Sequence, residues 1–383
     1  MTSTVRIGVI GVRLGRWHVE SFGQVPGCEV QAVCDMDPAR LADVQSQFGV
    51  ARTYERVADI LADPDLDAVS VCLPNHLHAE VAVAALQAGK HVLIEKPLAR
   101  TAAEGEQIVD AARRAGKQAM VAMKFRFSPE AQFLKRHVES GALGNLYYGW
   151  NRYIRPVGKG IPGRWFCRRQ FSGGGSLIDN GVHMLDITWH LMGHPAPVEA
   201  FGSCSAQFGP RGKGLAAEDA QAFDVDDFAA GMIRFANGAT ILLDNAWVAH
   251  VHETQIGAWV CGTEGSGSLW PFRLVEDRDG ASRDVTPAAE SLAGENQFAH
   301  FVRSVRDNVP NASPAQQGLV MLRMLEALYH SSQLGCSVRV ATRGTTVPCK
   351  CGTGHSADPA VLGVESLYGK AGAGPVVAAA RLV

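Results

Sequence analysis

Three residues in two separated segments of the chain have side chains suited to moving a hydride and a proton. Lys96 closely follows a short apolar run, residues 91–94, while Asp179 and His183 lie in a glycine-rich stretch, residues 173–183. A fixed ammonium group stabilises negative charge that develops on a reacting oxygen, and an imidazole transfers protons near neutral pH. Beside a nicotinamide, these side chains would serve chemistry at a carbon–oxygen bond.

Asp179 and His183 are four residues apart, so on a helix their side chains share one face. There Asp179 can orient His183 or accept a hydrogen bond from a neighbouring hydroxyl group. A lysine alone is more often a solvated surface residue, and a histidine alone is more often a core residue bonded to backbone. We favour the catalytic interpretation because both groups lie within longer motifs, which are described below.

A glycine turn after the first apolar run, residues 5–10, predicts a dinucleotide site. In such sites the pattern G-x-G-x-x-G lets the backbone approach the pyrophosphate. The turn from Gly11 to Gly15 is one residue short of this pattern and carries Arg13 where a glycine is usual. Arg13 could either bind a phosphate or crowd it, and we expect crowding.

Asp35 ends the next apolar run, where a carboxylate accepts a hydrogen bond from the ribose 2′-hydroxyl and repels a 2′-phosphate. The alternative is a simple turn residue at the end of a strand. We therefore expect NAD, with NADP less favoured. The residues expected to contact this cofactor are Gly11, Val12, Arg13, Leu14, Gly15, Asp35, Leu73, Pro74, Asn75, Glu95 and Lys96.

Residues 1–123 alternate apolar runs with helical patterns, which predicts a dinucleotide-binding domain. The runs are residues 5–10, 30–34, 68–73, 91–94 and 118–122. Strands that alternate with helices form right-handed crossovers and a parallel, doubly wound sheet of the Rossmann type. The fold class is therefore α/β for this part of the chain.

Residues 124–340 show longer, often alternating strands with flanking helices. Asn237 and Gly238 form a hairpin signal between two of these strands. The pattern predicts an α+β domain on a large, mainly antiparallel sheet, with one helix over residues 179–192. Residues 341–383 are rich in glycine and alanine and lack periodicity, so we expect a mobile tail.

The composition excludes several classes of partner. With 36 basic and 38 acidic residues, the chain has no overall charge that favours nucleic acid or an anionic membrane. No apolar stretch is long enough to span a membrane, and no signal peptide precedes the first strand, so we expect a cytoplasmic protein. Cys349 and Cys351 lack the spacing and the second ligand pair of a zinc site, and we predict no metal.

Two long motifs resemble those of the Gfo/Idh/MocA family of oxidoreductases, which includes inositol dehydrogenases and glucose-fructose oxidoreductase. The first combines LPNHLH at residues 73–78 with ALQAGKHVLIEKPL at residues 85–98. The second is GGGSLIDNGVHMLD at residues 173–186. The likeness extends from residue 5 to about residue 340. Arg13 and the residues after 340 depart from the family pattern.

The resemblance implies roles for particular residues. In relatives, the motif lysine touches the reacting oxygen and the helix aspartate and histidine face the substrate, which implies that Lys96, Asp179 and His183 are catalytic. In relatives, the segment that corresponds to residues 153–165 passes near the substrate. A cis peptide bond often precedes the proline of the Glu-Lys-Pro motif in relatives. The residues expected to contact substrate are Lys96, Tyr153, Arg155, Arg164, Trp165, Asp179 and His183.

We therefore expect an oxidoreductase that transfers a hydride between NAD(H) and a secondary alcohol or ketone of a sugar, glycoside or cyclitol. The alternatives are a reductase of a keto-sugar, including nucleotide-linked ones, and a non-catalytic dinucleotide-binding regulator. The expected partner is a small polyhydroxylated molecule, and the resemblance implies a homodimer or homotetramer packed through the second-domain sheet.

Overall fold

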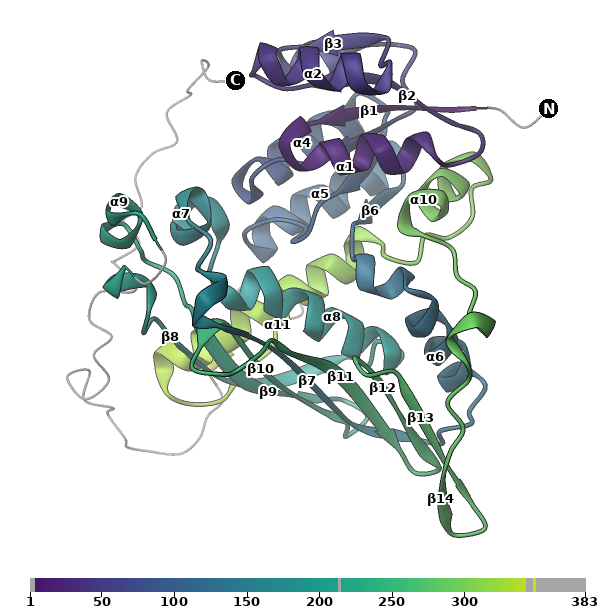
Figure 1. Cartoon of the computed structure of the whole chain (residues 1–383), viewed down its shortest axis with the longest axis vertical. Helices are drawn as coiled ribbons and strands as arrows, with labels where there is room; N and C mark the ends of the chain where they lie inside the picture. The colour runs from purple at the N-terminus through teal and green to yellow at the C-terminus, as the bar shows by residue number, and fades with distance from the viewer. Residues whose placement is uncertain (1–3, 213–214, 342–346, 349–383) are drawn as a thin grey trace.

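The computed structural model describes residues 4–212, 215–341 and 347–348. Its amino-terminal part is a six-stranded parallel sheet in the order β3-β2-β1-β4-β5-β6, with helices on both faces (Figure 1). The strands are β1 Val5–Ile10, β2 Cys28–Cys34, β3 Arg52–Tyr54, β4 Ala68–Val71, β5 His91–Ile94 and β6 Ala119–Val121. The helices are α1 Val12–Gly23, α2 Pro38–Phe48, α3 Val57–Ala62, α4 Asn75–Gln87 and α5 Ala102–Ala115.

This arrangement confirms the predicted doubly wound fold. The central strands β1, β4 and β5 are buried along nearly their whole length, as expected for parallel strands that are covered by helices on both faces. The sequence pattern missed β3 and α3. β3 has only three residues, Arg-Thr-Tyr, and none of them is fully buried, so no apolar run marks it.

The carboxy-terminal part is built on a ten-stranded sheet in the order β14-β13-β12-β11-β7-β10-β9-β8-β15-β16. Among the described strands of this sheet only β7 and β10 pair in parallel, so the sheet is mainly antiparallel, as predicted. The strands are β7 Leu146–Pro156, β8 Pro197–Ser205, β9 Phe228–Phe235, β10 Thr240–Ala249, β11 Gln255–Gly262, β12 Gly265–Leu269, β13 Arg273–Arg278, β14 Ala281–Asp284, β15 Val338–Arg339 and β16 Val347–Pro348. The hairpin at Asn237 and Gly238 joins β9 to β10, with Gly238 at φ 85°.

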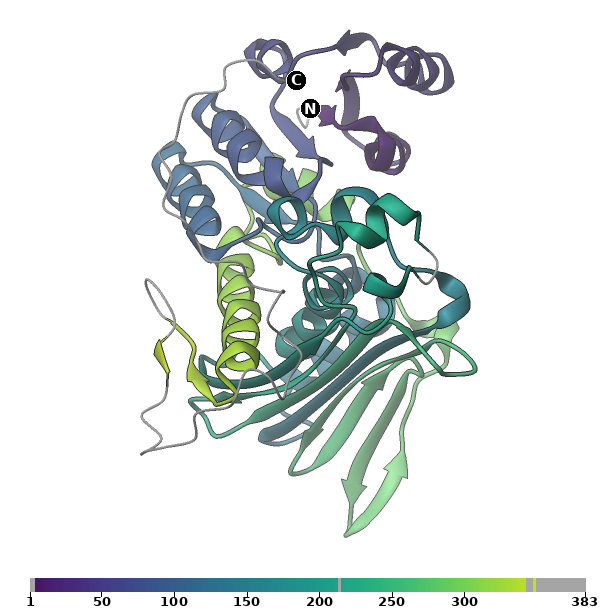
Figure 2. The ribbon, with the colours of Figure 1, turned by 90° about the vertical axis from the view of Figure 1, so that its left-hand side faces the viewer.

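Helices cover one face of this sheet and leave the other without a described helix (Figure 2). The α-helices are α6 Pro129–Glu139, α7 Arg169–Ser172, α8 Val182–Leu191, α9 Ala217–Gln221, α10 Gln297–Arg306 and α11 Ala315–Leu334. The short helical turns are η1 Lys124–Phe127, η2 Val157–Lys159, η3 Arg164–Cys167, η4 Leu177–Gly181, η5 Gly209–Arg211 and η6 Ala289–Ser291. No described helix is long and apolar enough to cross a membrane.

The helix predicted over residues 179–192 differs from the one observed. Residues Leu177–Gly181 form a π-helical turn, η4, and the α-helical part, α8, follows it from Val182 to Leu191. Single π-turns inside helices are rare and often occur at functional sites. Of the predicted tail, only Ala341 and the short strand β16 are among the described residues. Cys349 and Cys351 lie outside them.

Candidate active site

Lys96 and Asp179 meet where the two parts of the molecule join. The ammonium nitrogen of Lys96, just beyond β5, donates to Asp179 Oδ1 at 2.7 Å and to the Asp179 backbone oxygen at 3.1 Å. The indole Nε1 of Trp247, on β10, donates to Asp179 Oδ2 at 2.8 Å. Burial raises the pKa of Asp179, but the charge and hydrogen bond of Lys96 outweigh it and leave that pKa below its usual value. The carboxylate is therefore ionised and held at both oxygens.

His183 lies one turn further along the same helical segment. Its side chain is buried, its ring contacts Phe125 at 5.0 Å between centroids, and its Nδ1 has no hydrogen-bond partner among the described residues. Burial, followed by the charges of Lys96 and Lys124, lowers the pKa of His183 well below its usual value. Burial and the two lysine charges thus disfavour the charged imidazolium form of His183. No hydrogen bond joins it to Asp179, whose carboxylate bonds Lys96 and Trp247 instead.

A small cavity of about 70 Å³ brings together residues from the predicted cofactor and substrate sets. The side chains of Lys96 and Asp179 form part of its wall. Its lining residues are Leu14, Leu73, Asn75, Glu95, Lys96, Pro97, Trp165, Phe166, Ser172, Gly174, Ile178 and Asp179. The first turn of α1, the end of β5 and the segment before α8 thus meet at one point. The peptide bond between Lys96 and Pro97 is cis, as the resemblance implied.

The glycine turn has the backbone geometry that a dinucleotide requires. Gly11 has φ 88°, and a Cβ added there would lie 2.6 Å from the Cys72 backbone oxygen, so a side chain is excluded. At Gly15 a Cβ would lie 2.7 Å from Val9, which explains the close packing of α1 on β1. The N-cap residue, Gly11, makes no side-chain cap to α1, and the first turn of the helix holds no acidic residue. Apart from Val12 N, which donates to Asp35, the N–H groups of this first turn are of the kind that bind a pyrophosphate.

Asp35 is tied to this turn rather than standing free at the end of β2. It is buried, and its carboxylate accepts hydrogen bonds from Val12 N at 2.9 Å and Asp37 N at 3.0 Å. Arg40 lies 3.6 Å from the Asp35 carboxylate. The side chain of Arg13 is exposed in the first turn of α1. The expectation that Arg13 crowds a phosphate, and the alternative that it binds one, both stay predictions.

Two other predicted cofactor residues have structural partners. Asn75 Nδ2 donates to the Ser172 backbone oxygen at 2.8 Å, which links the start of α4 to the end of α7. Glu95 is buried and accepts from the ring of His18 at 3.0 Å and from the backbone N–H of Lys96 at 3.1 Å. Leu73 lines the cavity and Pro74 immediately precedes α4. These contacts position the strand ends that a nicotinamide ribose would approach.

The predicted substrate residues divide into two groups. Trp165 lines the cavity and stacks on Phe166 with ring centroids 3.8 Å apart. Arg155 donates to backbone oxygens at residues 159 and 160, and its charge contributes to the lowered pKa of Asp179. Arg164 is exposed, and Tyr153 lies on β7 opposite Asn245. The predicted substrate residues that do not line the cavity with Lys96 are Tyr153, Arg155, Arg164 and His183.

Trp247 and His18 are site residues that the sequence reasoning missed. Strand alternation on β10 places Trp247 on the same face as the buried Leu243, and the Trp247 side chain is fully buried. A buried indole N–H needs a hydrogen-bond acceptor, so the strand pattern indicated that Trp247 has one but could not identify it as Asp179. His18 lies within α1 and bonds both Ser70, at 2.8 Å, and Glu95. Its helical position gave no indication of either bond.

A Rossmann domain joined to an α+β domain, with Lys96 and Asp179 at the junction, is the architecture of an NAD-binding oxidoreductase. Comparison with known families agrees. The model described as "Oxidoreductase family, NAD-binding Rossmann fold" matches residues 5–123, and the "GFO/IDH/MocA C-terminal domain" matches residues 131–268. The chain belongs to the Gfo/Idh/MocA family of oxidoreductases, as the sequence motifs indicated.

Individual relatives are sugar-modifying enzymes. The D-glucoside 3-dehydrogenase of Escherichia coli (strain K12) is 29% identical over 350 residues, which are 88% of this chain and 98% of that protein. The putative UDP-kanosamine synthase oxidoreductase subunit of Amycolatopsis mediterranei is 32% identical over 325 residues, covering 79% of this chain and 88% of that protein. A structure of levoglucosan dehydrogenase in complex with NADH and levoglucosan has a TM-score of 0.79 and 25% identity, covering 89% of this chain and 100% of that one.

Proposed function

We propose that this protein is an NAD-dependent dehydrogenase that oxidises a secondary hydroxyl group of a pyranose glycoside to a ketone. The single observation that carries the proposal is the contact of Lys96 with Asp179 at a cavity shared with the glycine-turn helix. It sets a fixed cation at this cavity, and the buried His183 lies one helical turn beyond Asp179, within range of the Lys96 charge. Sugar-acting relatives support the substrate class.

The proposed oxidation breaks the O–H and C–H bonds of one carbinol carbon and forms a carbonyl. The substrate hydroxyl binds at the Lys96 ammonium group, which stabilises negative charge as the proton leaves. His183 accepts that proton and later releases it to solvent. Bound NAD⁺ supplies the acceptor for the hydride. Asp179 holds the ammonium group in place, and the ring of Trp165 gives a flat surface for a sugar.

A second candidate is the reduction of a keto-sugar, including one carried on a nucleotide. The likeness to the putative UDP-kanosamine synthase subunit favours this possibility. The same residues serve both directions: in reduction His183 would pass a proton from solvent to the oxygen, and Lys96 would polarise the carbonyl. The non-catalytic regulator is disfavoured because the chain retains all three of Lys96, Asp179 and His183.

The test is to follow NADH absorbance with a panel of substrates at fixed enzyme concentration. The panel contains methyl glucosides, levoglucosan, free hexoses and myo-inositol with NAD⁺, and the corresponding keto-sugars with NADH. Turnover of a glycoside that is lost in Lys96→Met supports the proposal. A protein that binds NAD(H) but turns over none of these compounds contradicts it and leaves the regulator as the better interpretation.

We also propose that the uncovered face of the large sheet pairs with a second copy of the chain. Phe201, Met232, Leu242, Trp150 and Trp259 are register partners from strand to strand and form one row across five strands. Phe201, Met232 and Leu242 are 47%, 41% and 37% exposed. An apolar row of this extent on a monomer is a mark of an interface.

We also propose a location in the cytoplasm. The reducing conditions there suit the free thiols of the cysteines in the described part of the chain.

A further inference from the structure

The helical segment that carries Asp179 and His183 begins without a cap from its own residues. Ser176 precedes η4 and makes no side-chain capping bond to it. The first N–H groups of a helix have no hydrogen-bond acceptors within the helix, so a buried helix start needs acceptors from elsewhere in the chain. Here the acceptors belong to Asp226, which lies just before β9 and is 3% exposed.

The Asp226 carboxylate accepts four hydrogen bonds. Its Oδ1 accepts from Gly175 N at 2.8 Å and from the Tyr329 hydroxyl at 2.7 Å. Its Oδ2 accepts from the Ser176 hydroxyl and from Leu177 N, each at 2.9 Å. The backbone oxygen of Asp226 also accepts from Ser176 N at 2.9 Å. Three consecutive residues at the start of the segment are therefore bound to this one residue.

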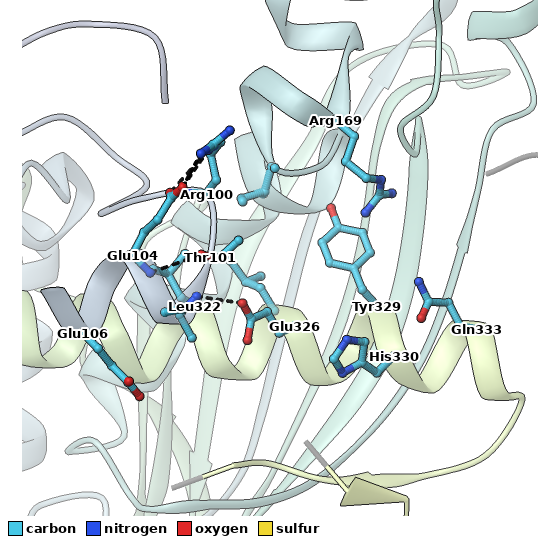
Figure 3. A pocket seen from close by; sticks show the side chains of 15 residues that line it. Arg100, Thr101, Glu104, Glu106, Arg169, Leu322, Glu326, Tyr329, His330 and Gln333 are labelled. Carbon is cyan, nitrogen blue, oxygen red and sulfur yellow. Dashed lines mark hydrogen bonds and ion pairs between the residues drawn. The ribbon is translucent and has the colours of Figure 1, made fainter. Parts of the chain in front are cut away.

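The glycine run before η4 allows this close approach. A Cβ on Gly174 would overlap the ring and hydroxyl of Tyr329, and a Cβ on Gly175 would overlap the backbone oxygen of Asp226. Figure 3 shows Arg169 beside the ring of Tyr329, and the guanidinium carbon lies 5.4 Å from the ring centroid. Tyr329 thus reaches from α11 to Asp226, along the edge of a second cavity of about 630 Å³.

We propose that Asp226 and Tyr329 are positioning residues that fix the segment presenting Asp179 to Lys96 and His183 to the substrate. The inference rests on the proposed function for its kinetic consequence. Leu177, bound by Asp226, is two residues from Asp179, so a shift of the helix start displaces the Lys96 contact. A displacement of about 1 Å at a reacting group costs on the order of 10²-fold in rate.

Asp227 provides a matched control for this proposal. It is adjacent and fully buried, and its carboxylate also accepts backbone hydrogen bonds. Those bonds come from Gln207, Phe208 and Gly209, at 2.9, 2.6 and 2.8 Å, and lie in the loop after β8 rather than at η4. Asp226→Asn and Asp227→Asn therefore remove equal charge from two anchors, of which only one holds the catalytic segment.

The experiment measures kcat, the KM for NAD⁺ and amide hydrogen exchange of both full-length variants, with the best substrate of the panel. Asp226→Asn should lower kcat by roughly 10- to 100-fold, leave the KM for NAD⁺ within about twofold, and speed exchange at residues 175–183. Asp227→Asn should speed exchange at residues 207–209 and change kcat only a few-fold. Equal kcat losses in the two variants, or unchanged exchange at residues 175–183 in Asp226→Asn, would overturn the proposal.

Tyr329→Phe keeps the test decisive if Asp226→Asn does not fold. It removes one of the four donors and retains the ring, so it should lower kcat several-fold with the KM for NAD⁺ unchanged. An unaltered kcat would count against the proposal. If the wild-type protein were inactive on the whole panel, the proposed function would fail, while the exchange difference between Asp226→Asn and Asp227→Asn would still decide whether Asp226 holds the segment.

Discussion

At the scale of single residues, the site depends on how Lys96 and Asp179 hold one another. Two oxygens of Asp179 fix the ammonium nitrogen, and Trp247 takes the remaining carboxylate oxygen. Because the pKa of Asp179 is lowered, the carboxylate stays charged across the neutral range. The ammonium group is therefore oriented before substrate arrives, which is the condition for strong electrostatic stabilisation of a transition state.

We propose that Arg13 contributes to cofactor binding, because its exposed positive charge lies in the first turn of α1. We expect Arg13→Gly to weaken NADH binding by roughly two- to fivefold, the size of an exposed charge interaction. Titration of cofactor fluorescence measures the change, and Arg13→Ala controls for the flexibility of glycine. Tighter binding in both variants would show that the side chain crowds the pyrophosphate, as the sequence first suggested.

The sequence identified Lys96, Asp179 and His183 through their motifs but not through their partners. No local pattern states that Asp179 bonds Lys96 and Trp247, because those residues lie 83 and 68 positions away in the chain. The exposure of Arg13 was equally hidden, since the helix start at Val12 was not located from the pattern. Partners that depend on the packing of distant strands emerge only from the three-dimensional arrangement.

At the scale of elements, the main difference from the sequence prediction is the π-turn η4. Apolar spacing predicts a helix, but it does not distinguish one extra residue in a turn, so the prediction gave a single helix. The structure supplies a physical reason for the glycines before it, which contact Arg100, Tyr329 and Asp226 too closely for any side chain. The alternation of strands and helices explains the parallel amino-terminal sheet, whereas the short β3 and the parallel pairing of β7 with β10 were not predicted.

Gly175→Ala should disturb the element that carries the site. The added methyl group would overlap the Asp226 backbone oxygen, so the helix start must move. We expect a loss of about 1–3 kcal/mol in the free energy of unfolding, measured with urea, together with a large fall in turnover. Gly158→Ala is the control, because a Cβ there has nothing within 4 Å. Equal stability and turnover in the two variants would refute the close approach.

At the scale of the whole molecule, the apolar row on the large sheet predicts a homodimer or a larger assembly of dimers. Leu242→Lys, near the centre of the row, should shift the mass measured by light scattering toward the 40.9 kDa of one chain. A buried lysine without a partner opposes association. Leu334→Lys is the control, since Leu334 is 50% exposed at the end of α11 and lies outside the row. A wild-type mass of one chain at micromolar concentration would contradict the pairing.

The half-buried His91 should make the fold sensitive to acid. Burial, with the charge of Lys117, lowers the pKa of His91 from 6.5 to about 4, and His91 Nδ1 accepts a hydrogen bond from Gln118 N. Between pH 6.5 and 4 the unfolded chain binds a proton that folded His91 does not, so stability falls as the pH drops through this window. His91→Asn should reduce the slope of unfolding free energy against pH by up to about one proton. An unchanged slope in urea titrations would exclude this cause.

The central claim is that Lys96 supplies the charge for hydride transfer, and its most direct test is the turnover of Lys96→Met. Methionine keeps the length of the side chain and removes the ammonium group, so NADH binding should remain nearly intact. The variant should lose roughly 10²- to 10³-fold in kcat on the substrate identified by the panel. Lys124→Met is the matched control, because Lys124 also lowers the pKa of His183 but is exposed and lies outside the cavity that Lys96 lines. A near-normal kcat for Lys96→Met would contradict the assignment and place the chemistry elsewhere in the molecule.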